Sequence, residues 1–202
     1  MPPKGERRKQ QIIQTAKDMF MEKGFQSTHI GQVCDKLDIA RGTVYQYFSN
    51  KKEILYAILD ALIEEIGDIL DADDLVELYD RGMDKKAFDR FVMDRIAASI
   101  SAIVNEPILI KLIFKEISGI DEEVIDYVNK TVDKVVKLIA GEIEYNKKKG
   151  LFKPSLNAYI SASMLVGGVC LLVYEYDKTK RDVMDRGVIE SISNNYLHGV
   201  FK

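Results

Sequence analysis

Apolar side chains recur at intervals of three and four residues along most of the chain, the spacing that places them on one face of an α-helix. The first segment carries such a stripe at Ile12, Ile13, Ala16 and Phe20, and Gly24 follows where a left-handed residue would end a helix. No useful run alternates apolar and polar residues, so the sequence predicts an all-α protein. About nine helices are expected, over residues 6–23, 28–37, 40–48, 51–70, 86–104, 108–118, 121–149, 155–177 and 181–200, with a short helix or loop at 75–84.

The second and third predicted helices are short and are separated by a tight turn at Asp38, a residue type that tolerates the left-handed conformation. In the third, Val44 and Phe48 can point inward while Arg41 and Tyr45 share an outer face. A helix of about two turns is not stable alone. The first two helices must therefore hold the third in a three-helix helix-turn-helix domain.

We expect this helix-turn-helix domain to span residues 1–50, with the start of the fourth helix to about residue 56. Residues 51–202 are expected to form a C-terminal helical bundle domain. Its longest apolar run, 164–174, has 11 residues, short of the roughly 18 that a membrane span needs. The N-terminus has no apolar signal-peptide region. A soluble, cytoplasmic protein without a membrane partner is expected.

The net charge of −3 conceals an asymmetry, because residues 1–56 carry +4 and residues 57–202 carry −7. A basic N-terminal quarter on an acidic body is typical of a protein with one anionic partner surface, although chance unevenness is the alternative. Cys34 and Cys170 lie far apart, and His29 and His198 are isolated. We therefore predict no metal site, no cofactor and no catalytic constellation.

The third helix has the chemistry that reading a major groove requires. Arg41 suits a guanine edge, Gln46 suits an adenine edge or a phosphate, and Gly42 lets DNA approach the helix start. Hydroxyl donors come from Thr43, Tyr45 and Tyr47, and Lys51 adds charge at the start of the fourth helix. The alternative is a polar surface helix with half-buried tyrosines.

The pattern in this region resembles the TetR family of transcriptional regulators, and the resemblance is specific over about residues 7–56. It is carried by Gly24, Phe25, Thr28, Ile30, Val33, Cys34, Ile39, residues 41–48 and residues 51–55. The resemblance implies a TetR-like fold. It also implies phosphate contacts from Thr28, Thr43, Tyr45, Tyr47 and Lys51, base-edge or groove contacts from Arg41, Gly42 and Tyr45, and DNA-facing positions for His29 and Gln46.

Three residues depart from the family pattern. Ala40 replaces the usual Ser or Thr cap of the third helix, Asp38 replaces a turn glycine, and His29 replaces a Ser or Thr beside the second helix's cap. These departures are expected to change the affinity for DNA and leave the fold intact.

The resemblance also implies a homodimer that pairs through the last two helices, with interface candidates Ser163, Gly167, Gly168, Ile192 and Tyr196. The alternative is that the eighth helix is the buried centre of one domain. The helices between would enclose a pocket for a small-molecule effector of unknown identity. Candidate lining residues, each of which could instead be plain core, are Phe88, Phe91, Ile96, Ile113, Phe114, Ile117, Val128, Tyr159, Met164 and Tyr174.

The expected function is sequence-specific transcriptional regulation: a repressor released from a palindromic operator in double-stranded DNA by a small, apolar effector. The competing hypothesis is a constitutive DNA-binding protein whose C-terminal domain docks a protein partner without a ligand. An enzyme would require convergent titratable groups, which the sequence does not indicate.

Overall fold

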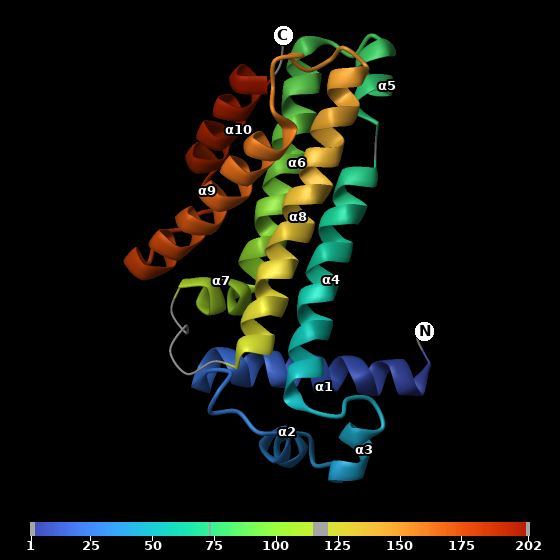
Figure 1. The fold of residues 1–202 in the computed structure, drawn as a ribbon, viewed down its shortest axis with the longest axis vertical. Helices are drawn as coiled ribbons and strands as arrows, with labels where there is room; N and C mark the ends of the chain where they lie inside the picture. The colour runs from blue at the N-terminus through green and yellow to red at the C-terminus, as the bar shows by residue number, and fades with distance from the viewer. Residues whose placement is uncertain (1–2, 73, 115–120, 201–202) are drawn as a thin grey trace. The chain divides into compact units, whose positions relative to one another are not determined.

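The computed structural model describes residues 3–72, 74–114 and 121–200, and every regular element in these ranges is a helix (Figure 1). The predicted all-α fold is confirmed. The described helices are α1 (Lys4–Lys23), α2 (Ile30–Leu37), α3 (Arg41–Tyr45), α4 (Lys51–Asp71), α5 (Leu75–Asp80), α6 (Lys85–Asn105), α7 (Pro107–Phe114), α8 (Glu122–Lys148), α9 (Ala158–Thr179) and α10 (Arg186–Val200). The short α5 occupies the segment that the sequence left as a short helix or loop.

The chain divides into two compact units. Unit 1 comprises Met1–Ala61 and Glu106–Asn129, and unit 2 comprises Leu62–Asn105 and Lys130–Lys202. Both α4 and α8 therefore contribute residues to each unit. Compactness does not assign function, so the division of roles at residue 50 stays a prediction.

The core of unit 1 is built on the apolar stripe of α1. Ile12, Ala16 and Phe20 are fully buried, and the ring of Phe25 meets that of Phe20 edge-on at 5.1 Å. Gly24 has φ 86°, and its N–H donates to the carbonyl of Phe20. The predicted end of the first helix is thus confirmed, because the left-handed residue turns Phe25 back onto the stripe.

Polar side chains join α7 and the start of α8 to the N-terminal helices within unit 1. Lys17 of α1 pairs with Glu106 at 2.6 Å, and the ammonium group of Lys111 in α7 donates to the carbonyl of Met21 at the end of α1. The ring of Tyr127 in α8 stacks on Tyr56 of α4 at 3.8 Å. These contacts explain why residues far along the chain belong to the same unit as α1–α3.

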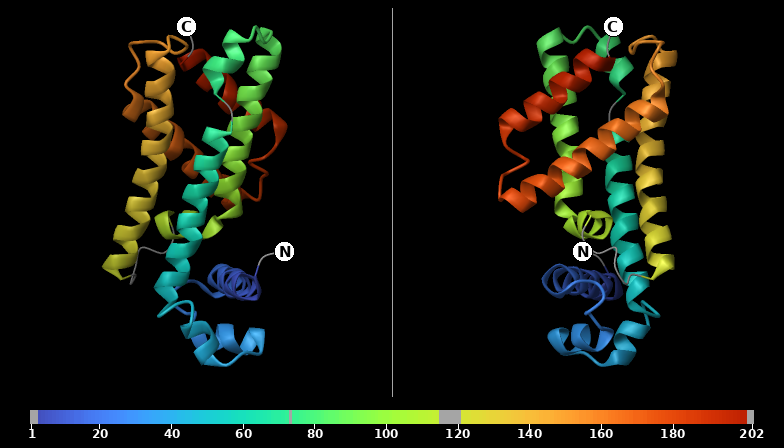
Figure 2. Two further views of the ribbon diagram at one scale, coloured as in Figure 1. Left: turned by 90° about the vertical axis from the view of Figure 1, so that its right-hand side faces the viewer. Right: turned by 60° about the vertical axis from the view of Figure 1, so that its left-hand side comes forward.

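Unit 2 is a bundle in which α9 and α10 both pack on α6 (Figure 2). Its apolar interior includes Val92 and Ile100 of α6, Ile143 of α8 and Ile66 from the second half of α4. The loop between α8 and α9 is anchored by Phe152, which is fully buried and meets the ring of Tyr196 edge-on.

The predicted helix starts are off by two residues at α2, three at α9 and five at α10, which begins at Arg186 and not at residue 181. The cap of α2 is His29 and not Thr28, because the Thr28 hydroxyl donates to backbone carbonyls of the preceding segment. Helix α9, the eighth helix of the sequence prediction, begins at Ala158 and not at residue 155. The side chain of Asn157 caps it by accepting a hydrogen bond from the N–H of Ile160. At α2 the hydroxyl that could cap the helix is engaged elsewhere. At α9 the boundary is set by the side chain of Asn157, which reaches a free N–H group.

Candidate DNA-binding face and effector pocket

A left-handed turn and two buried side chains fix α3 in place. Asp38 has φ 50° and ψ 53°, as its place in the predicted turn requires, and the N–H of Ile39 donates to the carbonyl of Cys34 at 3.1 Å. Val44 is fully buried and Phe48 is nearly so. A helix of five residues is thereby held by packing from one side, and its opposite side is left for a partner.

The outward side of α3 carries most of the residues predicted to touch DNA. Arg41, Gly42, Tyr45 and Gln46 are all exposed, and the spacing of these positions puts them on one face. Tyr45 has 54% of its surface exposed, a large fraction for an aromatic side chain. Thr43 and Tyr47 flank the face and are half-buried. We call Arg41, Gly42, Tyr45 and Gln46 the α3 face.

The first turn of α2 lies against the Arg41 side chain, a contact that the sequence did not indicate. A Cβ atom built at Gly31 would stand 3.0 Å from the Arg41 guanidinium, so the absence of a side chain at residue 31 lets Arg41 pass over α2. An open hollow of about 540 Å³ runs along this junction, lined by His29, Ile30, Gly31, Gln32, Asp35, Arg41, Tyr45, Ser49, Asn50 and Lys51. The exposed His29 therefore lies beside the α3 face.

Thr28 does not offer its hydroxyl to a phosphate. The side chain is fully buried, and the hydroxyl lies 2.9 Å from the carbonyl oxygen of Gly24 and 3.3 Å from that of Met19. The predicted phosphate contact of this hydroxyl is wrong, because the hydroxyl instead satisfies backbone carbonyls at the end of α1, where helical partners are missing.

Lys51 also turns inward. Its ammonium group donates to the carbonyls of Phe25, Gln26 and Thr28 at 2.7, 2.8 and 3.0 Å, and lies 4.7 Å from the centre of the Phe25 ring. Partial burial lowers the pKa of Lys51. The predicted phosphate contact of this ammonium group is therefore corrected: the group closes the α1–α2 loop.

The start of α4 is capped by side chains. The Asn50 side chain accepts from the N–H groups of Lys52 and Glu53, and the Glu53 carboxylate accepts from the N–H of Ser49. The arrangement resembles a capping box, but Glu53 accepts from the residue before the cap and not from the N–H of Asn50. The start of α3 differs, since Ala40 has extended backbone angles but a side chain without an acceptor.

Comparison with known proteins agrees with this geometry. The family model for bacterial regulatory proteins of the tetR family matches residues 12–58, the segment that contains α2, α3 and the start of α4. An uncharacterized HTH-type transcriptional regulator from Bacillus subtilis, YhgD, is 23% identical over 94% of both chains. The chain carries the N-terminal domain of the TetR family at residues 12–58. It is a helix-turn-helix transcriptional regulator, as the sequence predicted.

Solved structures of this fold extend over the whole chain. A putative TetR-family regulator from Syntrophomonas wolfei superposes with a TM-score of 0.71 at 21% identity and covers 94% of this chain and 92% of that one. FadR from Bacillus subtilis, solved in complex with stearoyl-CoA, gives a TM-score of 0.67 at 18% identity over 94% and 98%. At these identities the likeness concerns the fold alone.

Unit 2 contains a small apolar hollow of about 70 Å³, which we call the inner hollow. It is lined by Leu70, Leu75, Val92, Arg95, Ile96, Ser99, Ile100, Ile103, Ile139, Glu142, Leu165, Val166, Val169 and Tyr196. Of the nine described residues that were predicted to line an effector pocket, Ile96 alone belongs to this set. The sequence did not identify the other lining residues, because an apolar helix face can either pack in a filled core or line a cavity.

The other predicted pocket residues lie elsewhere. Tyr159 and Met164 are 53% and 73% exposed on α9, so their predicted place inside a pocket is wrong. Phe88 is buried beside a separate open hollow. Ile117 falls outside the described residues. The remaining positions, in the core or half-buried away from the inner hollow, are Phe91, Ile113, Phe114, Val128 and Tyr174.

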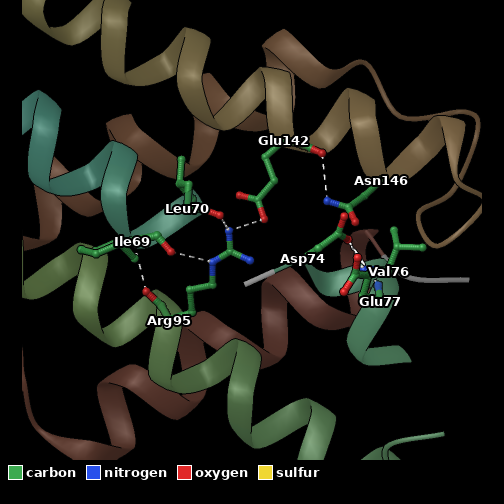
Figure 3. Close-up of polar contacts among 9 residues, drawn as sticks. Ile69, Leu70, Asp74, Val76, Glu77, Arg95, Glu142 and Asn146 are labelled. Carbon is green, nitrogen blue, oxygen red and sulfur yellow. Dashed lines mark hydrogen bonds and ion pairs between the residues drawn. The ribbon is translucent and has the colours of Figure 1, made fainter. Parts of the chain in front are cut away.

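A buried ion pair forms the polar wall of the inner hollow (Figure 3). The guanidinium of Arg95 in α6 lies 2.9 Å from the carboxylate of Glu142 in α8 and also donates to the carbonyls of Ile69 and Leu70 in the last turn of α4. Burial raises the pKa of Glu142, an effect that the nearby Arg95 partly offsets. The pair thus joins three helices of unit 2 at the edge of its cavity.

A second, larger hollow of about 440 Å³ adjoins the same pair, and we call it the outer hollow. It shares Leu70, Leu75, Arg95 and Glu142 with the inner one and is otherwise lined by Gly67, Asp71, Asp74, Leu138, Gly141, Tyr145 and Asn146. An apolar space and a polar space therefore meet at Arg95 and Glu142.

The residues predicted for a dimer interface separate into two groups. Gly167 and Gly168 are exposed, and a Cβ atom built at either would meet open space, while Ser163 and Ile192 are half-buried. Tyr196 is half-buried and lines the inner hollow, where burial raises its pKa; its place in a dimer interface stays a prediction. Two other apolar side chains of α9, Ile160 and Leu171, are exposed and were not among the candidates.

By length and composition α9 could also cross a membrane, a property that core helices of soluble proteins share and that is weak evidence by itself.

Proposed function

We propose that this regulator is a repressor. A homodimer binds a roughly palindromic operator through two copies of the α3 face, and a small molecule that enters unit 2 releases it. The observation that carries the proposal is the exposed face of α3, in which Arg41, Tyr45 and Gln46 stand on a helix fixed from behind by Val44 and Phe48. Such a face presents a bidentate guanidinium, an amide and a hydroxyl to base edges.

The effector part of the proposal is supported by the inner hollow and its polar wall, and by FadR, a protein of the same fold solved with a bound small molecule. The hollow lies beside the last turn of α4, a helix that begins next to the α3 face. Release is a population shift: a ligand that binds one state of unit 2 more tightly raises the population of that state. Fewer dimers can then place their two α3 faces in successive major grooves. Such a regulator acts in the cytoplasm.

Selection of binding sites from a random duplex pool tests the DNA-binding part. The full-length protein should enrich an inverted repeat whose half-sites lie about 34–36 Å apart or a multiple of it. A pool that stays random after several rounds would contradict operator recognition. A library of small molecules screened against the selected duplex then tests release. If no molecule in the library alters DNA binding, the result supports the competing model, in which the protein binds DNA constitutively and docks a protein partner.

A further inference from the structure

The outer hollow is rich in hydrogen-bond acceptors and negative charge. Asp71, Asp74 and Glu142 contribute three carboxylates to its lining, against the single guanidinium of Arg95. The ionised lining groups therefore leave a formal charge of −2. An electrostatic surplus alone does not define a binding site, but it decides which sign of ligand the space favours.

The guanidinium of Arg95 is already committed to acceptors within unit 2. Besides Glu142, it donates to the carbonyls of Ile69 and Leu70, at the end of α4 where the helix dipole is negative. An anionic ligand would have to take Arg95 from these acceptors and stand beside the remaining carboxylates. The site is consequently unfavourable for a carboxylate or phosphate head group.

Asn146 supplies the second, independent observation. Its side chain is almost completely buried and lines the outer hollow. The amide nitrogen donates to the carbonyl of Glu142 at 2.9 Å, which fixes the orientation of the amide. The amide oxygen has no hydrogen-bond partner among the described residues. A buried acceptor without a donor is destabilising, so a ligand that brings an N–H group to this oxygen removes that penalty.

We propose that the effector is an amphipathic organic cation, an aliphatic amine whose ammonium group binds in the outer hollow. The ammonium donates to the amide oxygen of Asn146 and faces the carboxylate of Glu142, while the alkyl chain extends past the ion pair into the inner hollow. This inference rests on the proposed effector function and names its ligand class.

Two observations favour an organic amine with a flexible chain over other cations. Among the described residues, no group of three or more His, Cys, Asp or Glu could hold a metal ion. The inner hollow, at about 70 Å³, is less than half the roughly 150 Å³ of an engineered cavity that binds benzene. The end of a methylene chain enters such a narrow space more readily than a rigid ring, and the rest of the chain lies in the outer hollow of about 440 Å³.

Calorimetric titration of the full-length protein without DNA tests the ligand class. Three probes of equal chain length are compared at pH 7: 1-octylamine, 1-octanol and octanoate. The amine should bind at least about tenfold more tightly than the alcohol, as expected for a charge-assisted hydrogen bond in a partly buried site. Octanoate should bind most weakly. Equal affinities for amine and alcohol, or a preference for octanoate, would overturn the proposal.

Variants then locate the ammonium group. Glu142→Gln should weaken octylamine binding about tenfold and leave octanol binding nearly unchanged. Asp71→Asn, at an exposed lining position where folding is not at risk, should weaken the amine about two- to threefold. The matched control is Glu144→Gln, on the same helix but outside both hollows, which should leave octylamine affinity unchanged. Equal losses in all three variants, or none in the first two, would place the cation elsewhere.

The outcome is separable from that of the proposed repressor function. Octylamine that binds as described but does not displace the operator would support the ligand class and contradict release. A different molecule that releases the operator while octylamine fails to bind would contradict the ligand class and support release.

Discussion

Lys51 places its ammonium group against three backbone carbonyls between α1 and α2, so we predict a role in stability. Lys51→Met keeps an unbranched apolar side chain over Phe25 but removes all three hydrogen bonds. The free energy of unfolding should fall by about 1–3 kcal/mol in urea titrations, because partly buried carbonyls lose their donor. Lys36→Met, at an exposed position of α2 with the same change in charge, should stay within about 0.5 kcal/mol of the parent.

The salt dependence of DNA binding distinguishes this role from a phosphate contact. A lysine that neutralises one phosphate contributes about 0.9 to the slope of log affinity against log salt concentration. Lys51→Met should keep the parent slope at temperatures where the variant is folded. A lower slope with unchanged stability would show that the ammonium group leaves the loop and binds DNA.

Arg41 is the residue of the α3 face best suited to reading a base. Arg41→Ala should lose about 1–3 kcal/mol on the selected operator and relax the preference at one base pair in each half-site. The measurement is a competition between the operator and duplexes substituted at single positions. An equal loss on operator and random DNA would mean that Arg41 contacts phosphate alone. Gly31→Ala provides a related check, because the added methyl group displaces the Arg41 guanidinium without removing it.

Glu142 should impose a pH dependence of unusual sign. Burial raises its pKa above the ordinary 4.5, so at pH values between the two the folded state holds a proton that the unfolded state releases. Its contribution to stability is therefore greatest below pH 4.5 and is lost as the pH rises toward the raised value. Relative to the parent, Glu142→Gln should gain stability as the pH rises from 4 to 7, measured by urea unfolding.

Glu144 is the natural control for this measurement. A hydrogen bond from Lys147 lowers the pKa of Glu144, so the sign is reversed and the parent gains stability as the pH rises. The free energy of unfolding of Glu144→Gln should therefore fall relative to the parent over the same pH range. The change should be small, because solvent screens the exposed carboxylate. Parallel curves for both variants would contradict the difference in environment.

At the scale of elements, α3 is the least stabilised helix of the DNA-binding region. It has five residues, and its cap position is occupied by Ala40 with φ −64° and ψ 144°. These extended angles are those that a capping serine adopts. Ala40→Ser should raise the free energy of unfolding by about 0.5–2 kcal/mol. Ala40→Val, which adds volume but no acceptor, should not stabilise, and equal gains from both would exclude capping as the cause.

Local patterns in the sequence were sufficient to predict most of the helices. The stripe at Ile12, Ala16 and Phe20, the stop at Gly24 and the left-handed turn at Asp38 each depend on neighbours a few residues away. They could be predicted because helix spacing and backbone conformation are local properties.

The inward turn of Lys51 could not be predicted in the same way. Its three acceptors lie 23 to 26 residues earlier and converge only after α1, α2 and α4 have packed. The pocket shows the same limit. Met164 and Ile96 occupy equally apolar helical patterns, yet one is 73% exposed and the other lines the inner hollow. Periodicity identifies the apolar face of a helix, but whether that face packs in the core, lines a cavity or is exposed depends on the tertiary structure.

At the scale of the whole molecule, the exposed side of α9 carries an apolar stripe. Ile160, Met164 and Leu171 are 56%, 73% and 50% exposed, and the open space around Gly167 lies between them. Their spacings of four, three and four residues place them on one stripe, with a glycine where two backbones could approach closely. A second copy of the chain offers the same stripe, which is the self-complementary condition of a two-fold interface.

We therefore predict that the double substitution Met164→Lys, Leu171→Lys converts the dimer into a monomer. Four ammonium groups would meet in an apolar contact, where unpaired charge is costly. Sedimentation equilibrium at micromolar concentration should give the mass of two chains for the parent and of one for the variant. Thermal unfolding of the variant should remain cooperative, since both side chains point away from the core of unit 2.

Ile125→Lys is the matched control, because it adds a lysine at another exposed apolar position, on α8 and in unit 1. It should leave the dimer intact. Binding to the full operator should fall steeply in the α9 variant, because each monomer then pays the cost of association separately. Binding to a single half-site should change little in either variant. A double variant that still sediments as a dimer would remove α9 from the interface, and the exposed stripe would then have to serve a different protein.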